Sequence, residues 1–459
     1  MPRARWWVIG AMSVLTVTVV LLDATGVIFD APEPSLPPPL ALPTPDADGT
    51  AALAAVEPEP GDPDQGVMAS VERILRTKGL GKSVHAIVAP LADPARPWMQ
   101  IDADAAAAPA STLKLWTAAA TLDAFAPDER ITTSVLWDAA SNTLVLVGGG
   151  DATLQTNASR SSDSASLNDL ARNVARRLPQ LSSSSTKITL DYDTSLFTGP
   201  SVSPEWEPTY VSSGVIAPVT ALMVDQGMVS PPSLARYPEP AQAAAGTFAE
   251  LLRDRDVNIA SHYRSVDASE DLPAAGSIAV VKSAPMNDLV EEMLRNSDNQ
   301  IAESLGRLAA GASGLPTSFK GASRVIRRAA ASRGVDTTAA KIVDASGLSR
   351  EDRFSATGLL DALHVASDEP ALAPILSGLA VAGFDGTLAD RFQAGPASAA
   401  AGAVRAKTGT LTGISAEAGV TTSCSGVLVS YAFVADAVID TESARSALDR
   451  AAAALAACR

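Results

Sequence analysis

Cysteine and histidine are scarce in this sequence, and each shortage narrows the chemistry available to the chain. Its 459 residues contain only two cysteines, Cys424 and Cys458, and three histidines. An isolated cysteine pair in an exported protein is more often a disulfide than a metal site, so we expect a disulfide and no metal; two buried thiols are the alternative. The histidines accompany no Gly-x-Ser-x-Gly-like segment, which disfavours a Ser-His-Asp hydrolase.

Positive charge is also in short supply. The chain has 35 Lys and Arg against 51 Asp and Glu, a net charge of -16 and a pI near 4.7. Binding to nucleic acid requires clustered Lys and Arg for the phosphates, and no such cluster is present. We therefore expect no nucleic-acid partner, and the acidity favours solubility.

The first 65 residues differ from the rest. An uncharged run rich in Val, Leu and Trp spans residues 6–22 and follows Arg3 and Arg5, which predicts export with the positive end left in the cytoplasm. The run lies between a long signal-peptide core and a short membrane span, so residues 1–29 are expected to be an uncleaved anchor, with a cleaved signal as the alternative. Residues 30–65 are rich in Pro, Ala and Asp and are expected to form an extended linker.

The remaining chain, with 47% apolar residues overall, is long enough for two folded units. We expect residues 66–130 and 241–459 to form the main unit and residues 131–240 an inserted, mixed domain. Helical spacing of apolar residues predicts helices over 66–78, from 111 onward, and over 167–178, 241–254, 286–296, 301–310, 322–333, 356–367 and 442–457. Strands are predicted over 83–91, 132–138, 142–148, 187–191, 404–409, 416–423 and 427–435, the last three as an antiparallel run.

A serine and a lysine lie three positions apart where an apolar helix is expected to begin. Ser111 and Lys114 would share one helical turn, and an unprotonated lysine there can take the proton of the serine hydroxyl and make it a nucleophile. Burial and nearby positive charge would be needed to lower the pKa of Lys114. The same spacing recurs at Ser184 and Lys187, but that segment runs from a Ser-rich loop into a strand, so the helical geometry is missing.

Two further short motifs follow in the chain. Ser297-Asp298-Asn299 falls between two predicted helices, where its side chains can point into a cleft or simply cap a helix. Lys407-Thr408-Gly409-Thr410 begins the terminal strands, where Lys407 and the threonines can meet a carboxylate and Gly409 permits close approach of a ligand. Each motif alone is weak. Together, in this order and in helix, turn and strand settings, they form the set typical of penicillin-binding proteins and class A β-lactamases.

On these motifs the sequence resembles the class C low-molecular-mass penicillin-binding proteins, the D-alanyl-D-alanine carboxypeptidase/endopeptidase family, from about residue 66 to the C-terminus. Further family-like segments are 144–154, with Ala152 replacing the usual proline, and 344–350, 383–388 and 406–411. The resemblance implies an α/β (α+β) penicillin-binding transpeptidase-like fold, an antiparallel sheet flanked by helices plus an all-helical region. The sequence departs from the family pattern at one point: residues 217–222 are followed closely by Pro231-Pro232 and the helix expected from about residue 241, so we expect the nested third domain of the family to be reduced or missing.

The resemblance assigns a role to each motif residue. Ser111 would be acylated, Lys114 would activate it, Ser297 and Asn299 would assist proton transfer and hold the substrate amide, and Lys407 would complete the site. Thr408 and Thr410 would bind the terminal carboxylate, and the N–H groups of Ser111 and Thr410 would form the oxyanion hole. Glu205 and Glu207, flanking Trp206, are candidates for reading an amino group of the stem peptide, with exposed surface charges as the alternative.

The implied activity is that of a serine D-alanyl-D-alanine carboxypeptidase, or an endopeptidase, with peptidoglycan stem peptides as substrates, β-lactam antibiotics as inhibitors and no cofactor. The implied location is outside the bacterial cytoplasmic membrane, tethered to it, or secreted if the N-terminal segment is cleaved. A β-lactamase would place its deacylating glutamate in a compact region between the first two motifs, whereas a whole domain is expected there. The other alternative is an inactive peptidoglycan-binding or scaffold protein of the same fold, against which the intact nucleophile–base pair argues.

Overall fold

The computed structural model describes residues 63–158, 164–182, 187–230 and 234–456. The predicted anchor, most of the predicted linker (residues 30–62) and Cys458 lie outside these ranges. Within them, no helix has the length and apolar character needed to cross a bilayer. Cys424, at the end of the predicted strand 416–423, is disulfide-bonded.

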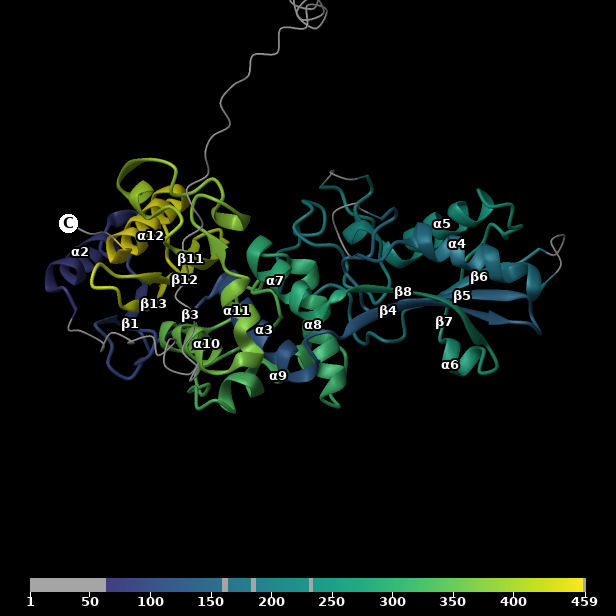
Figure 1. Ribbon diagram of the computed structural model, residues 1–459, viewed down its shortest axis with the longest axis horizontal. Helices are drawn as coiled ribbons and strands as arrows, with labels where there is room; N and C mark the ends of the chain where they lie inside the picture. Colours follow the sequence, from purple (N-terminus) through teal and green to yellow (C-terminus); the bar gives the residue numbers. More distant parts are fainter. Residues whose placement is uncertain (1–62, 159–163, 183–186, 231–233, 457–459) are drawn as a thin grey trace, which may run out of the picture. The chain divides into compact units, whose positions relative to one another are not determined.

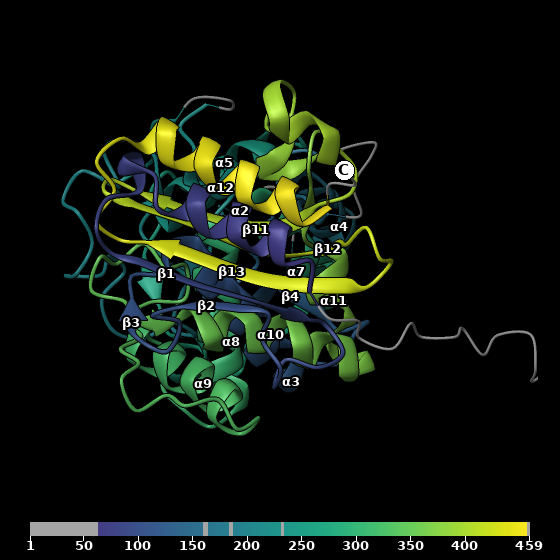
Figure 2. The ribbon, with the colours of Figure 1, turned by 90° about the vertical axis from the view of Figure 1, so that its left-hand side faces the viewer.

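A six-stranded antiparallel sheet organises the first part of the fold (Figures 1 and 2). Its strand order is β10-β11-β12-β13-β1-β2, so strands from the two ends of the described chain pair with each other. The strands are β1 (Val84–Pro90), β2 (Met99–Ile101), β10 (Ala380–Val381), β11 (Arg405–Leu411), β12 (Ile414–Thr422) and β13 (Leu428–Ala435). The predicted antiparallel run over 404–435 is confirmed.

Helices cover both faces of this sheet, which explains why its central strands are hydrophobic at successive positions. In β13, Tyr431 and Phe433 pack with α2 and α12, whereas Ala432 and Val434 pack with the helices of the opposite face. Figure 2 shows α2 (Gln65–Leu75) and α12 (Thr441–Ala456) side by side across the sheet. The opposite face carries α3 (Lys114–Ala124), α7 (Met286–Asn296), α8 (Asn299–Ala312), α9 (Phe319–Ala331), α10 (Ala356–Asp368) and α11 (Ala373–Ser377).

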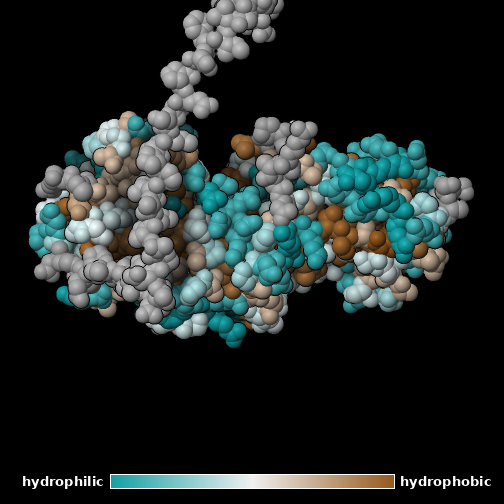
Figure 3. Space-filling model, in the orientation of Figure 1, coloured by the Kyte–Doolittle hydropathy of each residue, from teal (hydrophilic) through white to brown (hydrophobic). Residues whose placement is uncertain are grey.

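A second, five-stranded sheet has the order β7-β6-β5-β4-β8. Its β4–β5 and β4–β8 pairs are antiparallel, and its β5–β6 and β6–β7 pairs are parallel. Helices α4 and α5 pack on one face, and Figure 3 shows hydrophilic residues over these helices with hydrophobic residues beside the strands. The elements are β4 (Arg130–Asp138), β5 (Thr143–Val147), α4 (Leu167–Arg177), β6 (Thr189–Asp193), α5 (Pro240–Arg253), β7 (Ser265–Val266), α6 (Ala268–Asp271) and β8 (Gly276–Pro285).

This sheet continues past residue 240, where the sequence analysis ended the inserted segment. Helix α5 shares a core with α4 and the strands, and β8 returns antiparallel to β4 before α7 begins. The structural insertion therefore extends to Pro285. Short elements complete the fold: β3 (Ala106–Ala107) paired with β9 (Phe354–Ser355), and the 3-10 turns η1 (Lys78–Leu80), η2 (Ala110–Leu113), η3 (Leu178–Gln180), η4 (Asp225–Gly227), η5 (Pro370–Leu372), η6 (Gly386–Leu388) and η7 (Gly395–Ala400).

Candidate active site

Ser111 and Lys114 lie on one continuous turn at the start of α3. Ser111 falls in the 3-10 turn η2, and Lys114 is the first residue of α3. The Lys114 Nζ lies 2.8 Å from Ser111 Oγ, 2.8 Å from Asn299 Oδ1 and 2.6 Å from the Ser346 carbonyl oxygen. A neutral amine has two N–H groups and one lone pair. If Asn299 and Ser346 accept the two N–H groups, the lone pair is left for the Ser111 proton.

Burial favours this neutral form of the Lys114 amine. Lys114 is completely buried, and the loss of hydration lowers its pKa from 10.5 to about 8, although the carboxylates of Asp344, Glu303, Asp298 and Asp352 oppose the change. From the sequence, both burial and positive neighbours were expected to be needed for this effect. Burial is the largest cause, and the charged groups that act on the Lys114 pKa are acidic rather than basic.

The turn that joins α7 to α8 supplies the second motif. Asp298 caps α8 by accepting the backbone N–H of Ile301 at 2.9 Å, which is the structural role the pattern left open. Ser297 ends α7 with φ 56° and ψ 37°, a left-handed conformation that usually belongs to glycine. Asn299 accepts from Lys114 through Oδ1 and donates through Nδ2 to the Val215 carbonyl at 3.2 Å. Its side chain is therefore fixed from both ends.

Strand β11 divides its motif between two faces, because successive strand residues point in opposite directions. Thr408 and Thr410 face the cleft, and Thr408 Oγ1 bonds Thr387 Oγ1 at 2.9 Å. Lys407 is completely buried on the other face, and its Nζ donates to the Thr408 carbonyl at 2.7 Å. Burial, together with the charges of Lys114 and Arg391, lowers the pKa of Lys407 well below its usual value.

Gly409 allows β11 to approach the Ser111 turn. A Cβ on this residue would lie 2.8 Å from the Pro109 carbonyl oxygen and 3.0 Å from the Ser111 nitrogen, closer than side-chain carbons come. The glycine thus makes room for the nucleophile's own backbone, whereas the sequence analysis expected it to make room for a ligand. Gly347 does the same from a second side: it has φ 76°, and a Cβ there would lie 2.0 Å from the Ala110 carbonyl oxygen.

These segments enclose a cleft of about 600 Å³. Ser111, Ser297, Asn299, Thr408 and Thr410 all line it, so the structure brings five of the eight proposed site residues to one surface. Lys114 and Lys407 lie buried beneath it, and Gly409 lies beneath it against the Ser111 turn. The remaining lining residues are Tyr210, Val215, Leu348, Thr387, Asp390, Arg391, Leu411, Thr412 and Arg445.

The buried carboxyl groups of Glu303 and Asp344 form an acidic layer behind Lys114. No function was predicted for them from the sequence. Glu303 Oε1 accepts the backbone N–H groups of Ala345 and Ser346 at 3.1 and 2.9 Å, which holds the carbonyl that contacts Lys114. Burial raises the pKa of Glu303 to about 8, and its Oε2 has no partner among the described residues. Its spacing is the available signal, because position 303 is one helical turn after Asn299.

Asp344 joins this layer to the inserted part of the chain. Its carboxylate accepts the backbone N–H groups of Gly347 and Ser349, each at 2.7 Å, and the indole N–H of Trp206 at 2.7 Å. Trp206 is therefore a structural anchor for the loop behind Lys114. Of its two acidic neighbours, Glu207 lies 3.7 Å from Arg350, whereas Glu205 lines a different hollow beside α9; neither lines the cleft.

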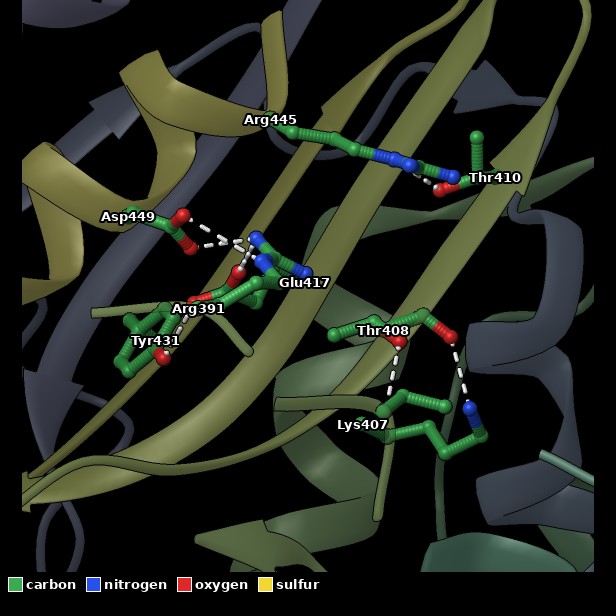
Figure 4. A network of polar contacts seen from close by, with 9 residues as sticks. Arg391, Lys407, Thr408, Thr410, Glu417, Tyr431, Arg445 and Asp449 are labelled. Atoms are coloured by element: carbon green, nitrogen blue, oxygen red, sulfur yellow. Dashed lines mark hydrogen bonds and ion pairs between the residues drawn. The ribbon is translucent and has the colours of Figure 1, made fainter. Parts of the chain in front are cut away.

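A second buried ionic cluster supports the β11 side of the cleft (Figure 4). Arg391 contacts Glu417 Oε2 at 2.7 Å and both carboxylate oxygens of Asp449, and Tyr431 donates to Glu417 Oε1 at 2.8 Å. Burial raises the pKa of Glu417 to about 7. The charge of Arg391 is thus balanced by two carboxyl groups. Arg445 extends from α12 towards Thr410 in the same view.

The chain matches one protein family along nearly all of its described length. The profile of the D-Ala-D-Ala carboxypeptidase 3 (S13) family matches residues 67–236 and 232–457. The chain is 36% identical to carboxypeptidase DacB of Mycolicibacterium smegmatis over 361 residues, which cover 76% of this chain and 75% of that protein. It is 35% identical to a carboxypeptidase of Mycobacterium tuberculosis over 426 residues, which cover 90% of this chain and 86% of the relative.

A solved structure shares the fold. Penicillin-binding protein 4 of Haemophilus influenzae superposes with a TM-score of 0.68 at 20% identity, over 84% of this chain and 97% of that one. The resemblance and the transpeptidase-like fold predicted from the sequence are confirmed. The chain therefore belongs to the D-Ala-D-Ala carboxypeptidase 3 (S13) family and is a serine-type peptidase.

Proposed function

We propose that this chain removes the terminal D-alanine from peptidoglycan stem peptides, or cuts the peptide crosslink between them, through an acyl-enzyme on Ser111. The observation that carries the proposal is the position of the Lys114 amine, which lies 2.8 Å from both Ser111 Oγ and Asn299 Oδ1 at the base of an open cleft. A serine beside a buried base of lowered pKa is an activated nucleophile. A protein that only binds the wall would need neither group.

In the proposed reaction, Lys114 takes the Ser111 proton while Oγ attacks the carbonyl carbon of the scissile amide. The oxyanion forms beside the N–H of Ser111, where β11 runs so close that residue 409 has no room for a side chain. Ser297, which lines the cleft, passes the proton to the leaving amine. Water then hydrolyses the ester and releases the shortened stem peptide.

Penicillins are proposed as inhibitors because their strained amide would acylate the same hydroxyl. The test uses a fluorescent penicillin on the purified ectodomain and on Ser111→Ala. We expect a stable covalent label on the wild type and none on the variant, together with loss of D-alanine release from purified muropeptides. A wild type without label, or a variant labelled to the same extent, would favour the inactive scaffold instead.

We propose that the enzyme works outside the cytoplasmic membrane, tethered by residues 1–29. The support is the uncharged run over residues 6–22 behind Arg3 and Arg5, and the disulfide at Cys424, since disulfides persist mainly in oxidising, extracytoplasmic compartments. The linker over 30–65 would let the folded part reach the wall. The intact mass of the protein isolated from the membrane fraction tests this: a mature N-terminus beyond residue 22 would replace the tether with secretion.

A further inference from the structure

The cleft needs a cation for the terminal carboxylate, and Lys407 is badly placed to supply it. Its side chain is completely buried, and its Nζ is engaged with the Thr408 carbonyl. Loss of hydration also favours its neutral form, as its lowered pKa records. From its motif, this lysine was expected to meet the substrate carboxylate together with the threonines. Its amine lies beneath the strand, near enough to Lys114 for the two charges to interact, and it does not line the cleft.

Arg391 lines the cleft as well, but its guanidinium is already paired with carboxylates of the protein. Two carboxylates contact its guanidinium, that of Glu417 on the neighbouring strand β12 and that of Asp449 on α12. An arginine balanced by two acids has little net field left for a third anion. Removing it would also leave two buried carboxyl groups unpaired.

Arg445 meets each requirement that these two residues fail. It is exposed, lines the cleft, and holds its Nε 3.4 Å from Thr410 Oγ1 (Figure 4). It forms no ion pair within the part of the chain that the structure describes. Asp449, one turn further along α12, has its oxygens on Arg391. Asp390 also lines the cleft, but the structure gives it no contact with Thr408 or Thr410.

We infer that Arg445 is the residue that selects substrates with a free terminal carboxylate, binding it together with the hydroxyls of Thr408 and Thr410. This assignment rests on the proposed function. A guanidinium offers a planar pair of N–H donors that matches a carboxylate, and its charge makes both hydrogen bonds stronger than the threonines can provide alone. Because the carboxylate belongs to the leaving D-alanine, Arg445 orients the scissile amide over Ser111 and does not take part in proton transfer.

The test compares two substrates that differ only at the terminus, an acyl-D-alanyl-D-alanine peptide and its terminal amide. Arg445→Gln should lower kcat/KM for the free carboxylate by about tenfold to a hundredfold, the range of a charge-assisted contact, and change the amide by less than about twofold. Arg445→Lys should lose less than Gln because it keeps the charge without the fork. The control Arg450→Gln lies on the same helix, bonds Ser446 and does not line the cleft, so it should affect neither substrate.

Each result decides the question. Thermal unfolding and penicillin labelling at saturating concentration are measured on every preparation, and both should be unchanged, because Arg445 is exposed and makes one long contact. If the Arg445→Gln enzyme takes the label and its kcat/KM falls equally for both substrates, or falls for neither, the selective role of Arg445 is overturned and the proposed function is not. A wild type that takes no label and releases no D-alanine overturns the proposed function, and this role with it.

Discussion

Replacing Glu303 by glutamine tests whether the buried acidic layer controls the protonation of Lys114. Burial lowers the pKa of Lys114 to about 8, and the charge of Glu303 is one of those that oppose this change; burial raises the pKa of Glu303 itself to about 8. An ionised Glu303 favours the protonated form of Lys114, which cannot act as a base. Glutamine retains an oxygen that can accept the Ala345 and Ser346 N–H groups but carries no charge. The Glu303→Gln variant should therefore need a lower pH to protonate Lys114.

The size of the effect follows from the neutral fraction of the amine. With a pKa of about 8, only about one-tenth of Lys114 is neutral at pH 7. Because the pKa of Glu303 is also about 8, its carboxylate is ionised mainly above pH 8, and the charge that opposes deprotonation of Lys114 is present mainly there. The second-order rate of acylation by a penicillin, measured from pH 5 to 10, should change little at pH 7 and should reach its plateau at a pH about one unit lower in Glu303→Gln than in the wild type.

Stability provides an independent readout with a definite sign. The folded-state pKa of Glu303 lies above its usual 4.5, so the stabilisation from its bound proton is lost as pH rises from about 4.5 through about 8. Glutamine does not ionise, and the variant's free energy of unfolding should fall less steeply across that window. Other groups that act on Lys114, namely Asp344, Asp298 and Asp352, remain in place.

Asp361→Asn serves as the control for Glu303→Gln. Burial raises the Asp361 pKa to about 6, but this residue is not among the carboxyl groups that act on Lys114. Its replacement should alter the pH dependence of stability and leave the acylation limb unmoved. An acylation limb that stays in place in Glu303→Gln, or moves to higher pH, would refute the proposed coupling.

Two backbone positions give the remaining predictions. Ser297→Gly should raise the free energy of unfolding by about 0.5–1 kcal/mol, because glycine adopts the left-handed conformation without strain. It should also slow acylation at least about a hundredfold, because the hydroxyl is lost. Chemical denaturation measures the first effect and penicillin labelling the second; a slower enzyme without added stability would contradict the strain. Gly409→Ala should lower the free energy of unfolding by about 1–3 kcal/mol, because its Cβ would displace the backbone of Pro109 and Ser111. The same displacement should slow acylation about a hundredfold. Normal acylation kinetics would contradict this packing argument.

Much of the fold could be read from the sequence because its elements carry strong local signals. The helices over 286–296 and 301–310 and the three terminal strands have clear apolar periodicity, and the structure places each within a few residues of its prediction. Strand β8 was missed. Only Ala279 and Ser283 of this strand are buried, and its apolar run is confined to residues 278–281, which is short for a strand signal. Pairing with β4, which is remote in sequence, makes it a strand.

The same distinction applies to the site. Ser111, Lys114, Ser297 and Asn299 could be named because their chemistry depends on short spacings within a helix or a turn. How deeply a side chain is buried depends on tertiary packing and cannot be derived from the neighbouring sequence. Nothing in the spacing of Lys407 indicates that its amine is buried beneath the cleft on the Thr408 carbonyl, or that Arg445, from α12, reaches Thr410.

Several features of this site oppose folding, and their concentration around one hydroxyl is itself informative. Ala110 and Ser297 hold left-handed backbones without being glycine, two lysines are completely buried, and Glu303 keeps an unpartnered oxygen. Each costs about one to a few kcal/mol, and none improves packing. The two hydrophobic cores, one on each face of the six-stranded sheet, offset these costs. A scaffold kept only for binding would gain stability by losing these groups, so their joint presence argues for catalysis at Ser111.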